Sequence, residues 1–217
     1  MALNTVIFDF DGTIADTNSL IINSWQHTYM ERTGKPGNEE DIIRSFGEPL
    51  AITMKKVFPQ FDVNESIEIY RSYQVGQFEK QIRPFPGMVE TVRNLKTDGY
   101  KVAVVTSRLR NTTLQGLNCF GIANDFDVIV SCEDTDKHKP NPEPVLMALD
   151  RLSAKPEEAV MVGDSMFDIC CAHNAGVQAA LVGWALAVTE QDMQGKDRPE
   201  YVLKAAKDIF GVLKEGR

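Results

Sequence analysis

The residues with the clearest chemical potential are two aspartates, Asp9 and Asp11, which directly follow the apolar run Val6-Ile7-Phe8. In such a pair, one carboxylate can be a nucleophile or metal ligand while the other moves protons. Because an unpaired buried carboxylate is costly, we expect both at the carboxyl end of a buried strand, where open α/β sheets place their ligand crevice. Gly12 permits a tight turn there. Taken alone, the pair also fits a solvated acidic turn without a catalytic role.

Three further groups of polar residues follow apolar runs or stiff loops downstream. Thr106 ends such a run, and its hydroxyl can hold an anion, with a helix N-cap as the alternative. Lys139 lies in a loop with several prolines, which can aim its ammonium group at a fixed point. Asp164 ends another apolar run and Asp168 lies one helical turn further on, so their hard oxygens suit Mg²⁺. Acids at a helix N-terminus are the alternative explanation for this last pair.

The elements that must position these residues alternate between strand and helix from residue 88 onward. The pattern predicts strands over 101–105, 128–130, 159–162 and 178–182, and helices over 88–97, 111–119, 142–152, 165–174 and 205–213. Repeated βα units indicate an α/β protein with a parallel sheet covered on both faces. Residues 15–84 contain no strand-like run and only short helical patterns, the longest of which predicts a helix over 64–78. We therefore predict a core formed by residues 1–16 and 85–217, and an inserted all-helical unit over 17–84.

Composition limits the class of partner and the compartment. The 217 residues carry a formal net charge of −8, which argues against nucleic acid as a partner. There is no apolar run long enough for a membrane span and no secretory leader pattern, so no membrane partner is expected. The four cysteines have neither metal-site spacing nor a disulfide framework. We expect a cytoplasmic protein, either a monomer or a small homo-oligomer.

Taken in order, these groups resemble the four motifs of the haloacid dehalogenase (HAD) superfamily. The motifs are Asp9-x-Asp11-Gly12-Thr13, the strand ending in Thr106, Lys139 before proline, and Gly163-Asp164-x-x-x-Asp168. The resemblance covers essentially the whole chain and implies a Rossmann-like parallel sheet core with an all-helical cap domain. The segments 84–87, 106–108 and 138–144 look like the phosphoglycolate-phosphatase-like branch. The chain is also similar to bacterial HAD-type inorganic pyrophosphatases.

The resemblance implies a role for each motif residue. Asp9 would be the nucleophile that becomes an aspartyl-phosphate, and Asp11 the general acid and then the general base. Thr106 and Lys139 would bind the phosphoryl oxygens. The implied Mg²⁺ site comprises Asp9, the Asp11 carbonyl and Asp164, with Asp168 supporting the metal's waters.

Substrate contacts are expected from both the core and the helical insert. The candidates are Gly12, Thr13, Ser107 and Arg108 from the core, and His27, Gly47 and Arg71 from the insert. A helix-packing histidine, a turn glycine and a surface arginine are the alternatives for the last three, and an exposed cation at a helix start is the alternative for Arg108. The function implied is a Mg²⁺-dependent phosphatase for a small phosphorylated metabolite, with phosphoglycolate or pyrophosphate as leading substrates.

Three alternatives remain open. A phosphosugar mutase of the same superfamily carries a histidine ten residues after the second aspartate, where this chain has Ile21. A receiver-type phosphoacceptor domain also uses strand-end aspartates, a hydroxyl residue and a lysine. Its phosphoaccepting aspartate, however, lies on a mid-chain strand, and it lacks a helical insert. A binding scaffold with little turnover would not be expected to keep all the motif residues.

Overall fold

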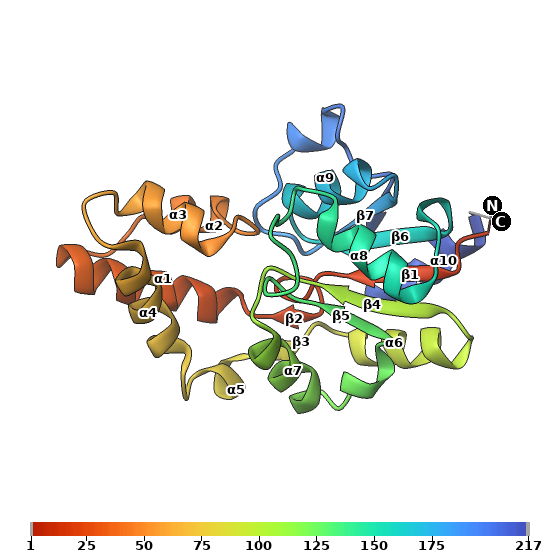
Figure 1. Ribbon diagram of the computed structural model, residues 1–217, viewed down its shortest axis with the longest axis horizontal. Helices are drawn as coiled ribbons and strands as arrows, with labels where there is room; N and C mark the ends of the chain where they lie inside the picture. The colour runs from red at the N-terminus through yellow and green to blue at the C-terminus, as the bar shows by residue number, and fades with distance from the viewer. Residues whose placement is uncertain (1, 216–217) are drawn as a thin grey trace.

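The computed structural model describes residues 2–215, and its main feature is a six-stranded parallel sheet (Figure 1). The strand order is β5-β4-β1-β6-β7-β8. The strands of this sheet are β1 (Thr5–Phe8), β4 (Lys101–Val105), β5 (Val128–Val130), β6 (Ala159–Gly163), β7 (Gln178–Val182) and β8 (Tyr201–Leu203). The predicted α/β fold class is confirmed.

Strand β1 occupies the middle of the sheet and is buried along its whole length. Val6 pairs with Val102 of β4 on one side and with Val160 of β6 on the other. Side chains alternate between the two faces of a strand, so Val6 and Phe8 join one hydrophobic cluster while Ile7 joins the other. Both strands that flank β1, which are β4 and β6, come later in the chain. In open α/β sheets, ligands bind at the carboxyl edge where the order of the strands reverses, so we expect the ligand crevice at the carboxyl end of β1.

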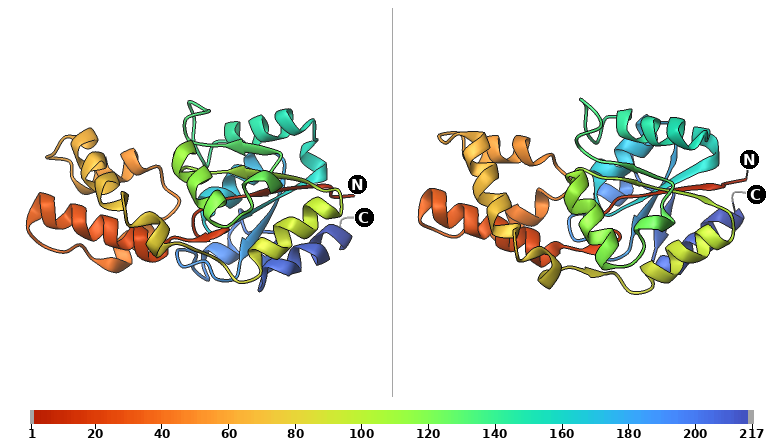
Figure 2. Two further views of the ribbon diagram at one scale, coloured as in Figure 1. Left: turned by 90° about the horizontal axis from the view of Figure 1, so that it is seen from below. Right: turned by 60° about the horizontal axis from the view of Figure 1, so that its bottom comes forward.

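Helices cover both faces of this sheet (Figure 2). One face packs against α6 (Met88–Thr97), α7 (Arg110–Cys119) and α10 (Ile209–Glu215). The other packs against α8 (Glu143–Leu152) and α9 (Met166–Asn174). Among the described residues, no helix combines the length and the apolar character needed to cross a bilayer.

A group of helices lies beyond the carboxyl edge of the sheet, at the left in Figure 1. Its members are α1 (Asn18–Thr33), α2 (Glu39–Arg44), α3 (Leu50–Val57), α4 (Val63–Gln74) and α5 (Phe78–Gln81). Helices α1 to α4 share a hydrophobic core of their own, in which Trp25, Phe58 and Tyr70 pack together, whereas Phe78 of α5 joins the hydrophobic cluster on the sheet. We call these five helices the helical unit.

Two expectations about strands and one about a helix are wrong. Residues 15–84 do contain strands, because β2 (Ala15–Asp16) and β3 (Arg83–Pro84) pair antiparallel where the chain enters and leaves the helical unit. Two residues are too few to produce a periodic pattern. The helix expected over 64–78 is interrupted after Gln74, where Gly76 takes a φ of 77° that ends the α-helical path before α5. Strand β8 was absent from the predicted set of strands.

Candidate active site

Three polar side chains emerge where neighbouring strands end. Asp9 follows β1, Thr106 follows β4 and Asp164 follows β6, and all three are buried. Backbone hydrogen bonds continue the sheet past these ends, from Asp9 N to Val162 O at 2.9 Å and from Thr106 N to Val130 O at 2.9 Å. The sheet therefore fixes the backbone at Asp9 and Thr106. All three residues, together with Lys139, line one cavity.

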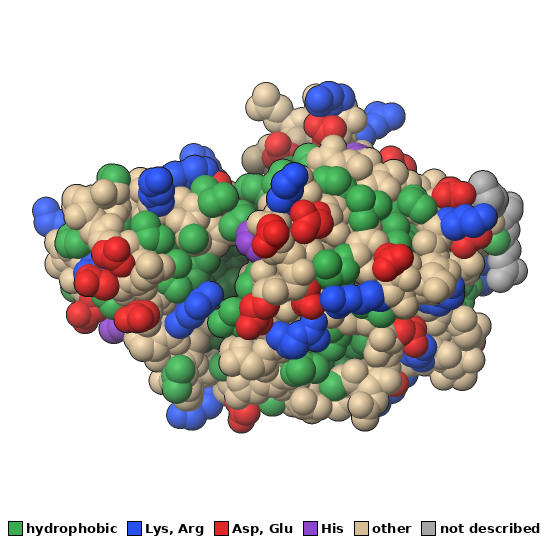
Figure 3. Space-filling model, viewed as in Figure 1, with side chains coloured by type: hydrophobic (Ala, Val, Ile, Leu, Met, Phe, Trp, Pro, Cys, Tyr) green, Lys and Arg blue, Asp and Glu red, His purple; other side chains and the backbone are tan. Residues whose placement is uncertain are grey.

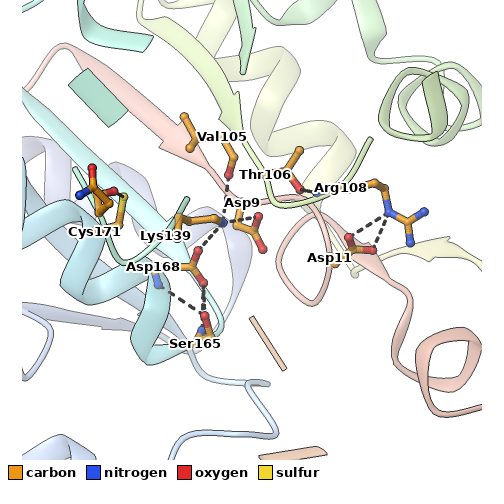
Figure 4. Close-up of polar contacts among 10 residues, drawn as sticks. Asp9, Asp11, Val105, Thr106, Arg108, Lys139, Ser165, Asp168 and Cys171 are labelled. Carbon is orange, nitrogen blue, oxygen red and sulfur yellow. Dashed lines mark hydrogen bonds and ion pairs between the residues drawn. The ribbon is translucent and has the colours of Figure 1, made fainter. Parts of the chain in front are cut away.

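Lys139 connects Asp9 to the rest of the site (Figure 4). Its Nζ donates to Asp9 Oδ1 at 2.7 Å, to Asp168 Oδ1 at 2.6 Å and to the Val105 carbonyl at 3.2 Å. The residue is only 4% exposed. Burial alone would lower the pKa of Lys139, but the carboxylates of Asp168 and Asp9 raise it above its ordinary value. Lys139 is thus a fixed cation at the base of the site.

Asp168 has both carboxylate oxygens committed to other groups. Oδ1 accepts from Lys139, and Oδ2 accepts from the Ser165 N–H at 3.1 Å and the Ser165 hydroxyl at 2.6 Å. Ser165 and Asp168 form a capping box at the start of α9. The helix-terminus explanation therefore accounts for Asp168. In this arrangement Asp168 orients Lys139, and it also belongs to the group of three carboxylates that could hold a metal ion.

The donor set at the base of the site fits a hard divalent cation. Oxygens of Asp9, Asp164 and Asp168 lie within 4.8 Å of one another, and all three residues are buried. Burial raises the pKa of Asp9 and of Asp164, and repulsion from the Asp168 carboxylate adds to the rise at both residues. Lys139 supplies one positive charge to three carboxylates, so a further cation would offset the remaining repulsion. Asp9, Asp164 and Asp168 are the carboxylates close enough together to hold it.

Gly12 allows Asp164 to lie directly against the loop after β1. A Cβ on Gly12 would lie 2.0 Å from Asp164 Oδ2, and its φ of 74° is a second reason for glycine. The Gly12 carbonyl accepts a hydrogen bond from Trp184 Nε1 at 3.0 Å, and Trp184 in turn packs on Phe85. Trp184 thus contacts the loop that carries Asp11 and Gly12, and in the sequence its only signal is its place shortly after a predicted strand.

Asp11 makes its contacts away from Asp9. Its two carboxylate oxygens accept from Arg108 Nε at 3.1 and 2.9 Å, and the two carboxylates face different directions in Figure 4. The Arg108 side chain is 8% exposed, so the expected alternative of an exposed cation is wrong. The Arg108 guanidinium lies 4.8 Å from the centre of the Phe78 ring, and its Nη1 donates to Gln74 Oε1 at 3.4 Å.

A cavity of about 510 Å³ lies between the carboxyl edge of the sheet and the helical unit. Figure 3 shows a hollow between the two parts of the molecule, with hydrophobic side chains along it. The predicted contacts that line the cavity are Gly12, Gly47, Arg71, Ser107 and Arg108. Thr13 is fully buried and is not among the lining residues, and its Oγ1 has no hydrogen-bond partner among the described residues.

His27 does not lie where it was expected. Its ring packs against Tyr73 at 5.1 Å, and it is not part of the cavity lining in the described structure, so the helix-packing alternative holds. The lining that sequence analysis missed includes Tyr70 and Gln74 of α4. Their spacing of four residues indicated only a shared helix face.

Gly47 brings the helical unit into contact with α9. A Cβ at this position would lie 2.5 Å from the Ser165 hydroxyl oxygen, and the φ of Gly47 is 84°. The loop between α2 and α3 therefore packs directly on the residue that holds Asp168. Through this contact, the position of the helical unit and the position of Asp168 depend on each other.

Comparisons with known proteins agree with this geometry. Residues 6–182 match the family model for haloacid dehalogenase-like hydrolases. Pyrophosphatase PpaX of Halalkalibacterium halodurans is 40% identical over 98% of both chains, and pyrophosphatase PpaX of Bacillus cereus is 38% identical over 98% of this chain and 97% of that one. A haloacid dehalogenase-like protein from Bacteroides fragilis superimposes with a TM-score of 0.88 at 26% identity, covering 95% of this chain and 99% of the other. With a matching family model over most of its length and relatives of this similarity, the chain belongs to the haloacid dehalogenase-like hydrolases.

Proposed function

We propose that this hydrolase is a Mg²⁺-dependent phosphatase whose substrate is inorganic pyrophosphate or a small phosphorylated metabolite such as 2-phosphoglycolate. The observation that carries the proposal is Asp9, a buried carboxylate with Lys139 at 2.7 Å and Asp164 beside it at the base of the cavity. A carboxylate held between a fixed cation and a metal-binding acid is suited to attack a phosphorus atom. The relatives named pyrophosphatase support pyrophosphate as the first substrate to test.

The chemistry follows from the roles of the side chains. A carboxylate oxygen of Asp9 forms a bond to phosphorus while the bond from phosphorus to the leaving oxygen breaks. Asp11, in its carboxylic acid form, gives its proton to that leaving oxygen. Water then attacks the aspartyl-phosphate, Asp11 takes the proton from this water, and Asp9 is released as a carboxylate.

Charge at the transferring phosphoryl group is balanced by groups already in place. Lys139 and the Thr106 hydroxyl would contact the phosphoryl oxygens from two sides. Asp9, Asp164 and the Asp11 carbonyl would hold Mg²⁺, which when bound supplies positive charge to the phosphoryl oxygens. Asp168 keeps Lys139 in position through its hydrogen bond at 2.6 Å.

The helical unit, within the proposed limits 17–84, would act as a cap that excludes water during the reaction. It supplies apolar cavity-lining side chains at Ile21, Trp25 and Leu50. Ile21 stands where a mutase would have its histidine, which favours hydrolysis over phosphoryl transfer within the sugar. Because the chain belongs to the haloacid dehalogenase-like hydrolases, the receiver-type phosphoacceptor domain is no longer a candidate.

Phosphoglycolate remains a second candidate because of the size and character of the cavity. A volume of about 510 Å³ with apolar side chains on the cap side leaves room for an organic leaving group. Pyrophosphate has no apolar surface that could pack against these side chains. The two candidates therefore have to be compared directly.

The test measures phosphate release with Mg²⁺ from pyrophosphate, 2-phosphoglycolate and a panel of sugar and nucleotide phosphates. Asp9→Asn should remove turnover of every substrate, because an amide oxygen is a poor nucleophile. Asp16→Asn is the matched control, since Asp16 is an exposed acid on β2 outside the cavity lining. Full activity of Asp9→Asn, or an equal loss in Asp16→Asn, would contradict the proposal.

A further inference from the structure

Arg108 is a cation close to the proposed phosphoryl site. It follows β4 in the segment Thr106-Ser107-Arg108, so its backbone is close to the proposed phosphoryl site. Its side chain lines the cavity, and it is held against the Asp11 carboxylate by contacts of 2.9 and 3.1 Å. The residue therefore contacts the proposed proton donor directly.

The Arg108 contact is incompatible with the role proposed for Asp11. A proton donor must direct a carboxyl oxygen to the leaving oxygen of a substrate whose phosphorus lies at Asp9. In the structure, both Asp11 oxygens face Arg108 instead (Figure 4). Asp11 must exchange this partner for the substrate before it can donate a proton.

The surroundings of Arg108 would keep the guanidinium in the cavity after that exchange. The Phe78 ring lies 4.8 Å and the Phe10 ring 6.0 Å from the guanidinium carbon, and Gln74 accepts from Nη1. Phe78 and Gln74 belong to the helical unit, whereas Phe10 and Asp11 belong to the loop after β1. Asp11 uses Nε and Gln74 uses one Nη1 donor, so the remaining donors of the fork can bind an anion.

We propose that Arg108 determines specificity by exchanging Asp11 for an anionic group on the leaving side of the substrate. That group is the second phosphate of pyrophosphate or the carboxylate of phosphoglycolate. Once it binds the guanidinium, the Asp11 carboxyl is released toward the bridging oxygen. A substrate with a neutral leaving group leaves the Arg108–Asp11 pair intact and is turned over slowly. This inference rests on the proposed phosphatase function and adds the class of leaving group to it.

The other cations near the cavity are less suited to this role. Lys139 is occupied at the base by Asp9 and Asp168. Arg71 also lines the cavity, but it lies on α4 with an exposed side chain and no contact to Asp11 among the described interactions. Arg71 is thus the competing candidate for binding the leaving group, and its variant belongs in the same experiment.

The test compares 2-phosphoglycolate with ethyl phosphate, which has the same carbon chain but no carboxylate. Arg108→Gln should lower kcat/KM for 2-phosphoglycolate about 100-fold more than for ethyl phosphate, because it removes a buried, charge-assisted contact. Arg108→Lys should recover part of the preference, since it keeps the charge without the fork. Arg44→Gln, at an exposed cation of α2, is the matched control and should keep the wild-type preference.

Two results would overturn the inference while the proposed function stands. One is an equal loss on both substrates in Arg108→Gln, which a purely structural role would produce. The other is loss of the preference in Arg71→Gln and not in Arg108→Gln. Circular dichroism and thermal melting establish that each variant is folded.

A binding experiment separates the inference from the reaction itself. In the Asp9→Asn background with Mg²⁺, calorimetry measures the affinity for methylenediphosphonate, a pyrophosphate analogue that resists hydrolysis. Adding Arg108→Gln should weaken this affinity about 100-fold, and an unchanged affinity would overturn the inference. Absence of turnover in the wild-type enzyme with every substrate would instead contradict the proposed function, and the binding result would still decide the role of Arg108.

Discussion

Replacing Asp164 with asparagine should stabilise the protein in the absence of divalent cations. Asp164 is 5% exposed, and burial together with the charges of Asp168 and Asp9 raises its pKa well above the ordinary value. Lys139 is the cation that opposes this effect, and no group among the described residues donates a hydrogen bond to the Asp164 carboxylate. Removing its charge therefore relieves repulsion without breaking a hydrogen bond.

The expected size follows from the spacing of the acids. Carboxylate oxygens of Asp9, Asp164 and Asp168 lie within 4.8 Å of one another. At such a distance two unit charges repel by about 3.5 kcal/mol when the effective dielectric constant is about 20. Attraction to Lys139 cancels part of the two repulsions that Asp164 experiences. We expect Asp164→Asn to raise the free energy of unfolding by about 1–3 kcal/mol in EDTA.

Magnesium should reverse this order of stability. A cation that binds only the folded protein adds about 2.7 kcal/mol at a concentration of 100 times its Kd, and Asp164→Asn should lose most of that gain. The assay is chemical denaturation of wild type and variant in EDTA and in saturating Mg²⁺. For each protein, the difference in the free energy of unfolding between the two buffers gives the contribution of Mg²⁺ to stability.

Asp168→Asn is the matched control because it makes the same chemical change four residues away. Both Asp168 oxygens accept hydrogen bonds, so this variant should be less stable than wild type in both buffers. The reasoning about charge would be refuted by an Asp164→Asn protein that is less stable than wild type in EDTA. An equal gain from Mg²⁺ in wild type and Asp164→Asn would refute the assignment of Asp164 as a ligand.

Gly47→Ala should raise KM about 10-fold with a smaller effect on kcat. The added Cβ would lie only 2.5 Å from the Ser165 hydroxyl oxygen and would force the loop between α2 and α3 away from α9. A wild-type KM in steady-state kinetics would contradict this prediction. Burial alone would raise the pKa of Asp134, but hydrogen bonds from Ser131 and two arginines lower it below 3.8. Its stabilising contribution is therefore present above pH 3.8 and is lost as the pH falls through the lower folded-state pKa. Asp134→Asn should cost about 2 kcal/mol at pH 7 and less at pH 3, and equal losses in denaturation at both pH values would contradict the assignment. Trp184→Phe removes the hydrogen bond to the Gly12 carbonyl and should lower kcat about threefold to tenfold at an unchanged KM, whereas an unchanged kcat would show that the loop is fixed without it.

The parts of the fold that could be predicted are those whose pattern is local. The strands 101–105, 128–130 and 178–182 have the predicted bounds, because each is an apolar run between polar turns. The pairing of Ala15 with Pro84 could not be predicted, since it depends on contacts between segments far apart in the chain. Tyr201–Leu203 became a strand only because the exposed edge of β7 was available.

In the candidate site, too, some residues could be located from a local sequence pattern and others could not. Asp9, Thr106 and Asp164 could be located from sequence because the carboxyl ends of neighbouring parallel strands meet at one edge. The partners of Arg108 could not, since they come from the loop after β1 and from two helices whose packing no local pattern describes. His27 failed as a candidate for the same reason, because its helix turns it toward Tyr73.

The central position of β1 has a consequence for how the chain folds. Val6 has paired strands on both sides only after the segments that contain Val102 and Val160 have been brought next to it. Contacts of such long sequence separation form slowly, because a large loop must close before they stabilise anything. During synthesis, the apolar segment that precedes the proposed nucleophile is made long before its partners and remains an unpaired, aggregation-prone edge until β6 emerges. We therefore expect refolding yield to fall with protein concentration, and added chaperone to protect this segment more than any other.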